Sequence, residues 1–173
     1  MQQEKDFSKL TKAQIPVLLK DALHEAQRIH RFVSEAQVAD FASFAAIAGA
    51  LSSSVQLLFD HSDIAAFGRA FQDVSGNVDE MVRQVRAISG EIEDVILQRH
   101  FSLIASAIEF QLQKLKISGL LFVHFLRTPD SDSDAVFGLA PPSVAFPHSL
   151  SYLLQLVAAL FHTLYPIFSA PPE

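Results

Sequence analysis

Apolar residues alternate spacings of three and four along residues 71–95, and this row constrains the fold more than any other feature of the chain. Such residues share one face of an α-helix, because a helix has 3.6 residues per turn. The row predicts a helix that packs as in a coiled coil, over about three and a half heptads. We call this row the seam and treat its members as candidates for binding a partner. They are Phe71, Val74, Val78, Met81, Val85, Ile88, Ile92 and Val95.

Two glycines, Gly76 and Gly90, lie within the seam segment. Each costs about 1 kcal/mol relative to alanine inside a helix. The seam keeps its phase through both glycines, which favours one long helix from about Asp63 to Ile117. Two shorter helices that break near Gly76 are the alternative. Beyond the seam the apolar stripe shifts to Leu97, Phe101, Ile104, Ile108, Leu112 and Leu115.

Two segments that precede the seam show the same helical period. Thr11 and Gln14 resemble a capping box at the start of the first segment, residues 11–36. The second segment, residues 41–59, has no charged residue, but its serines make a packed helix more favourable than a membrane span. The apolar rows are Leu19, Ala22, Ala26, Ile29, Val33 and Ala36 in the first segment, and Phe41, Phe44, Ala48, Leu51, Val55 and Leu58 in the second.

Residues 149–168 contain no Asp, Glu, Lys or Arg, and about 20 apolar residues suffice to span a membrane. Ser149 is the expected N-cap of a helix over this range. Polar and small residues gather on one narrow stripe, which is typical of a helix buried on three sides in a bundle. In the alternative membrane or channel reading, Ser151, Gln155 and His162 are the candidates for facing the channel.

These patterns predict an all-α fold, a single domain of about five helices with one long, coiled-coil-like central helix. The predicted parts are a bundle over 11–126, a loop rich in Pro and Asp over 127–148, and a final helix over 149–168 packed on the bundle. Phe137 and Phe146 lie in the predicted loop and are further candidates for binding a partner. The charged fraction of 18% is low, which indicates apolar surface for a partner, a lipid or a thick core.

The composition disfavours several functional classes. A net charge of −6 and the lack of a large basic cluster argue against nucleic-acid binding, which phosphate neutralisation dominates. The chain has no cysteine, so disulfides and thiolate sites are excluded. Histidines at helical ligand spacing, nucleophile elbows and phosphate-binding loops are also missing from the sequence. We therefore expect no metal, no other cofactor and no enzymatic activity.

The predicted function is that of a non-enzymatic interaction or scaffold module, which binds a protein partner or self-associates through apolar helix faces. The alternative is a membrane-associated or pore-forming protein that inserts residues 41–59 and 149–168 into lipid. An enzyme or cofactor carrier with a site assembled across helices is a third hypothesis. The polar first residues, MQQEKDFSKL, favour a cytoplasmic location, with membrane association as the alternative.

Overall fold

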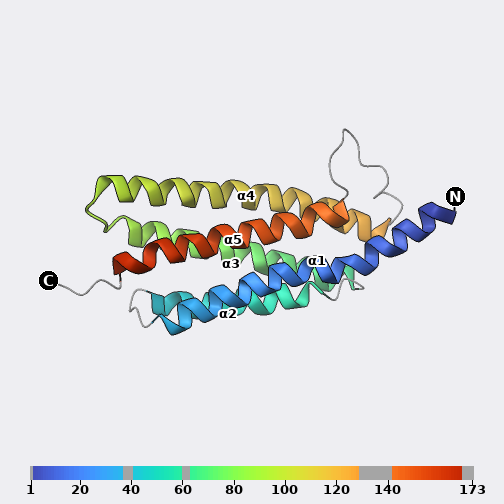
Figure 1. Cartoon of the computed structure of the whole chain (residues 1–173), viewed down its shortest axis with the longest axis horizontal. Helices are drawn as coiled ribbons and strands as arrows, with labels where there is room; N and C mark the ends of the chain where they lie inside the picture. The colour runs from blue at the N-terminus through green and yellow to red at the C-terminus, as the bar shows by residue number, and fades with distance from the viewer. Residues whose placement is uncertain (1, 37–40, 60–62, 129–141, 169–173) are drawn as a thin grey trace.

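The computed structural model describes residues 2–36, 41–59, 63–128 and 142–168, with side chains from residue 16 in the first helix and from residue 144 in the last (Figure 1). The described residues form five α-helices, which confirms the predicted all-α bundle. The helices are α1 (Gln2–Glu35), α2 (Ala42–Leu57), α3 (Ile64–Ser89), α4 (Val95–Arg127) and α5 (Pro142–Phe168).

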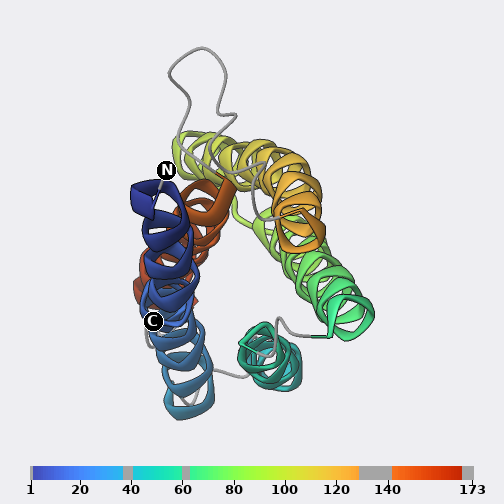
Figure 2. The same cartoon turned by 90° about the vertical axis from the view of Figure 1, so that its right-hand side faces the viewer.

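The helices follow one another around the bundle in the order of the sequence (Figure 2). Each helix packs against the next one along the chain, and α5 closes the arrangement by packing against both α4 and α1. Consecutive helices run in opposite directions, so that α1 and α5 run the same way (Figure 1). The apolar faces of all five helices therefore meet in one shared core.

The rows predicted for the first two helices lie in this core. Their members are fully or almost fully buried, apart from Ala36, which is partly buried. The predicted helix start at Thr11 is wrong, because α1 begins at Gln2. Pro16 consequently lies inside α1 instead of near its start.

The prediction of one long helix from Asp63 to Ile117 is wrong. The chain leaves α3 at Ser89 and enters α4 at Val95, and the break lies at Gly90 instead of Gly76, which is inside α3. Asp94 caps α4, because its Oδ1 accepts hydrogen bonds from the backbone N–H of Ile96 at 2.9 Å and of Leu97 at 3.3 Å. The seam spacing continues through this turn, although the residues of the turn are not helical.

The prediction of a loop over 127–148 is also wrong in its second part, because α5 begins at Pro142 instead of Ser149. Proline is well tolerated in the first turn of a helix, where its missing N–H has no helical acceptor. Phe146 is therefore a core residue of α5. Its ring packs against those of Phe67 and Phe122, with centroids 5.8 and 4.9 Å away. Phe137 lies outside the described residues.

Candidate functional site

The seam lies mostly inside the bundle. Its central residues, from Val74 to Val85, are buried, while Phe71, Ile88 and Ile92 are partly buried and pack against the core. Val95 is the exception, with 63% of its surface exposed at the start of α4. The helices of this chain thus cover most of the seam, which leaves little of it accessible to a partner.

A second row of apolar residues lies on α4 and faces away from the bundle. Ile96, Leu103, Phe110 and Ile117 follow one another at intervals of seven residues, and each is at least 60% exposed. Leu121, 51% exposed, continues the line on the same side of the helix. We call these five residues the outer row. At 1.5 Å per residue, the outer row extends over about 38 Å.

The outer row was not predicted from the sequence. The inner stripe of the same helix already provided the apolar side that packs into the core. The inner stripe packs in the core through residues such as Phe101, Ile108 and Leu112. Helix α4 therefore has apolar residues on two opposite sides. The sevenfold spacing of the outer row was the signal in the sequence that indicated the second side.

At 100° per residue the five members of the outer row span an arc of about 60° around the helix axis. Two further exposed apolar residues of α4, Val95 and Leu120, lie beyond one edge of the row and widen the exposed apolar face to about 120°. Exposed polar residues flank it on both sides, Ser106 and Gln113 on one and His100 and Lys114 on the other.

Charges of both signs lie near the outer row. Helix α4 contains four basic residues and one acidic residue, a net charge of +3 in a chain of net charge −6. Lys116 is paired with Asp79 of α3, and the exposed acids Glu91, Glu93 and Asp94 directly precede the start of the row.

The acid of α4, Glu109, accepts a hydrogen bond from Nε of Arg86 at 2.9 Å, so its charge is offset within the protein. The ammonium of Lys114 lies 5.0 Å from the ring centroid of Phe110 and places a cation directly on the outer row.

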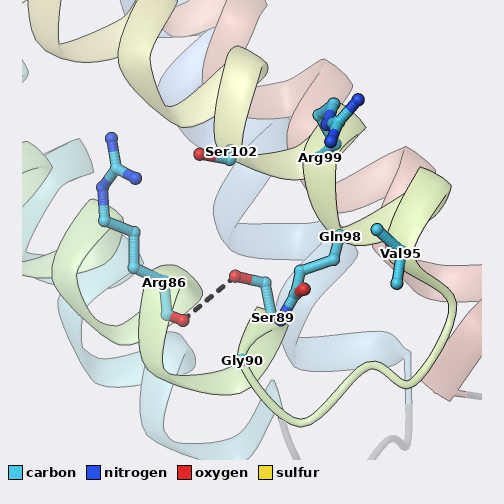
Figure 3. Close-up of a pocket in the computed structure, with 7 residues that line it drawn as sticks. All are labelled: Arg86, Ser89, Gly90, Val95, Gln98, Arg99 and Ser102. Carbon is cyan, nitrogen blue, oxygen red and sulfur yellow. Dashed lines mark hydrogen bonds between the residues drawn. The ribbon is translucent and has the colours of Figure 1, made fainter.

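Two hollows lie at the start of the outer row, near the turn between α3 and α4. One, of about 280 Å³, is lined by Val95, Ile96, Arg99, His100 and Leu103. The other, of about 440 Å³, lies between the helices (Figure 3). Its lining residues are Arg86, Ser89, Gly90, Val95, Gln98, Arg99 and Ser102. Val95 and Arg99 line both hollows, so the surface is indented where the outer row begins.

The hollow in Figure 3 does not resemble a catalytic site. Ser89 donates its hydroxyl hydrogen to the backbone carbonyl of Arg86 at 3.0 Å, and this internal bond occupies the hydroxyl. Arg86 is paired with Glu109. None of the seven lining residues is a carboxylate or a histidine that could act as a general base for Ser89 or Ser102.

A cleft of about 570 Å³ separates the outer parts of α3 and α4. The side-chain oxygen of Ser75 is buried at its base and has no hydrogen-bond partner among the described residues. Lys116 and Asp79 form a long ion pair of 3.9 Å at the cleft. The size is that of a small-molecule site, but the lining provides no activated nucleophile.

Of the predicted channel-facing residues of α5, Ser151 and Gln155 contact each other, whereas His162 packs against α1. Ser151 is buried and accepts a hydrogen bond from Gln155 at 3.4 Å, and Gln155 is exposed. His162 is exposed, and its ring centroid lies 4.2 Å from that of Phe32 on α1. Within the described residues, Val144–Phe168 is the one stretch long and apolar enough to cross a membrane, and half of its most apolar window is buried in the bundle.

Within the described ranges, no group of three or more His, Asp or Glu side chains is placed to hold a metal ion. Comparison of the chain with protein-family models, with curated proteins and with solved structures finds no match. The function is therefore argued from the geometry of the bundle.

Proposed function

We propose that the chain is a non-enzymatic protein-interaction module, and that its docking surface is the outer row of α4. The observation that carries this proposal is the sevenfold repeat of large apolar residues on an exposed helix face, from Ile96 to Ile117. Single exposed apolar residues are ordinary, whereas several large apolar residues exposed along one side of a helix are typical of a binding surface.

The spacing of the outer row favours a helix as the partner element. A repeat of seven places one residue of each heptad on the same side of the helix, and a partner helix that lies along α4 can contact each of them. The residues three after Ile96, Leu103 and Phe110 are Arg99, Ser106 and Gln113, so the contact has one apolar residue per heptad from α4 instead of the two of a coiled coil. The indentation beside Leu103 is suited to accept a side chain of the partner.

The membrane alternative inserts residues 41–59 and α5 into lipid, and the apolar row of residues 41–59 is fully buried in the bundle. The inner side of α5, which includes Leu150, Leu153 and Leu154, is fully buried. Insertion of α5 into lipid requires its separation from α1 and α4, and the residues of those helices would lose apolar contacts. Docking on the outer row requires no such opening, and we therefore favour the protein-interaction function.

The test compares affinity capture by two matched triple variants. One variant, Leu103→Gln/Phe110→Gln/Ile117→Gln, makes the outer row polar. The control, Val17→Gln/Leu57→Gln/Tyr152→Gln, changes three large hydrophobic residues on α1, α2 and α5 that are 49–65% exposed. Circular dichroism should show both variants folded, because exposed substitutions change stability by less than about 0.5 kcal/mol.

We expect at least one protein from an extract of the expressing cells to bind the native chain and the control variant. Its recovery on the outer-row variant should fall by at least about tenfold. The Kd of the purified partner for the outer-row variant should be at least about tenfold higher than for the native chain. Identical capture by all three proteins would contradict the proposal.

A further inference from the structure

We propose that the cleft between α3 and α4 binds an uncharged small molecule that has an apolar body and one hydrogen-bonding oxygen, a hydroxyl or a carbonyl. This site is separate from the outer row and goes beyond the proposed function. The proposal is carried by the shape of the cleft, by an unpartnered hydroxyl group that lines it and by the balance of the charges at it.

The cleft lies where both helices lack large side chains. Gly68 and Gly76 line it from α3, and Gly119 lines it from α4. A Cβ at Gly68 or Gly76 would meet no neighbouring atom within 4 Å, so nothing in the described part of the chain packs against these two glycines. Glycine inside a helix is destabilising relative to alanine. The result is an opening of about 570 Å³, a volume within the range of small-molecule sites.

The walls of the cleft are largely apolar. Phe71, Leu120 and Val123 line it. The ring of Phe71 lies against Gly119, since a Cβ at that glycine would be 2.5 Å from Cζ of the ring. Leu120 is 72% exposed, and a ligand in the cleft would cover part of its side chain. Removal of this apolar surface from water favours a ligand with an apolar body.

One polar side chain that lines the cleft has no partner. Ser75 is 8% exposed, and its hydroxyl oxygen is buried without a hydrogen-bond partner among the described residues. A serine in a helix often donates to a backbone carbonyl about one turn earlier, as Ser89 of α3 does to Arg86 at 3.0 Å. A buried hydroxyl without a partner is destabilising. A ligand oxygen that accepts a hydrogen bond from Ser75 would remove this cost.

The charges at the cleft favour an uncharged ligand. Lys116 and Asp79 form an ion pair of 3.9 Å, and no other residue that lines the cleft is charged. A charged ligand would be attracted by one member of this pair and repelled by the other. It would also lose hydration between apolar walls, which disfavours the charged form of any group. An uncharged ligand has neither disadvantage.

The experiment titrates the isotope-labelled full chain with 2-naphthol, an uncharged aromatic molecule with one hydroxyl group, and follows the glycine amide signals by NMR. The signals of Gly68, Gly76 and Gly119 should shift together, whereas those of Gly49 and Gly90, which lie outside the cleft, should not. For a ligand of this size we expect a Kd of about 0.1 mM.

Two variants test the shape of the cleft and its hydroxyl group. Gly76→Leu places a large side chain in the cleft and should abolish binding, and the variant should stay folded because leucine favours a helix more than glycine does. Ser75→Ala removes one hydrogen bond and should raise the Kd of 2-naphthol by about three- to tenfold. The matched control is Ser89→Ala, which lies outside the cleft and should keep the native Kd.

Thermal denaturation without ligand separates the two serines further. Ser75→Ala should not lower the Tm of the free chain, because it removes a buried hydroxyl that has no partner. A lower Tm would show that the Ser75 hydroxyl is already bonded within the protein, and it would overturn the proposal.

Two charged relatives of the probe, 2-naphthoate and 2-naphthylmethylammonium, test the charge preference. Each should bind at least about tenfold more weakly than 2-naphthol. Equal or tighter binding of either ion would overturn the assignment of an uncharged ligand.

The remaining outcomes decide the site itself. No binding of 2-naphthol up to its solubility limit, shifts at Gly90 as large as those in the cleft, or a Kd that either Gly76→Leu or Ser75→Ala leaves unchanged would each overturn the proposal. The outer-row variant Leu103→Gln/Phe110→Gln/Ile117→Gln should bind 2-naphthol as the native chain does. The small-molecule site and the proposed docking surface therefore stand or fail separately.

Discussion

The seam of α3 and the outer row of α4 are both apolar rows on one side of a helix, but the seam has twice as many residues per heptad and the two rows have opposite surroundings. Both are lines of large apolar residues on one side of a helix, but Val78 is fully buried whereas Phe110 is 60% exposed. The seam is the main apolar side of α3 and turns toward α2 and α4. The outer row lies opposite a denser inner stripe, and the core accepts that stripe instead.

This difference shows that periodicity identifies a helix face without saying what covers it. A helix with one apolar side places that side in the core, because burial of apolar surface drives folding. A helix with two apolar sides can place only one of them in the core of a bundle and leaves the other exposed. When a sequence shows two apolar rows on one helix, the less dense row is therefore the candidate for an intermolecular surface.

The largest expected effect on stability comes from a comparison of two phenylalanines on opposite sides of α4. Phe122 is fully buried against Phe67 and Phe146, and Phe110 lies in the outer row. Phe122→Ala should lower the free energy of unfolding by about 3–5 kcal/mol, through lost burial and the cavity it leaves. Phe110→Ala should lower it by less than about 0.5 kcal/mol. Urea denaturation measures both, and equal losses would contradict the assignment of the two sides.

A smaller effect concerns the turn that separates the two rows. Asp94 caps α4 through the N–H groups of Ile96 and Leu97. Asp94→Ala should lower the free energy of unfolding by about 1 kcal/mol, whereas Asp94→Asn should retain most of the stability, because both side chains accept the capping bonds. If thermal denaturation gave the same loss for both variants, the cap would not be what starts α4.

The smallest expected changes in stability concern two glycines, Gly76 on an open side of α3 and Gly119 on a packed side of α4. A Cβ at Gly76 meets no atom within 4 Å, so Gly76→Ala should raise the free energy of unfolding by about 0.5–1 kcal/mol. A Cβ at Gly119 would lie 2.5 Å from Cζ of Phe71. Gly119→Ala should instead lower it by about 1 kcal/mol, because the ring has to leave its contact with Phe146.

Denaturation curves of the two alanine variants, measured side by side, check this prediction. Stabilisation by Gly119→Ala as large as that by Gly76→Ala would show that the Phe71 ring moves freely into the cleft beside it.

The sequence allowed the helical class, the rows of the first two helices and the buried side of α4 to be predicted, because each depends on local periodicity. The break at Gly90 was not predicted. The apolar spacing from Ile88 to Val95 continues across the turn, and the cap formed by Asp94 is a local hydrogen-bonding feature that periodicity does not register. The early start of α5 was missed because Pro142 and Pro147 were interpreted as loop residues.

The candidate site was harder to predict than the fold. The seam was interpreted as the partner surface because it is the more regular row, but the position of α3 between α2 and α4 is a tertiary property. The exposure of the outer row follows from the tertiary structure, in which other helices cover only the inner stripe of α4.

The most direct test of the account uses the absence of cysteine from the chain. A single thiol is placed in each row, by Val78→Cys in the seam and Leu103→Cys in the outer row, and its rate of alkylation is measured under native conditions. We expect Leu103→Cys to react almost as fast as the denatured protein, and Val78→Cys to react at least about a thousandfold more slowly, because it reacts only when the bundle opens. Similar rates at the two positions, or protection of the thiol at position 103, would contradict a buried seam and an open outer row.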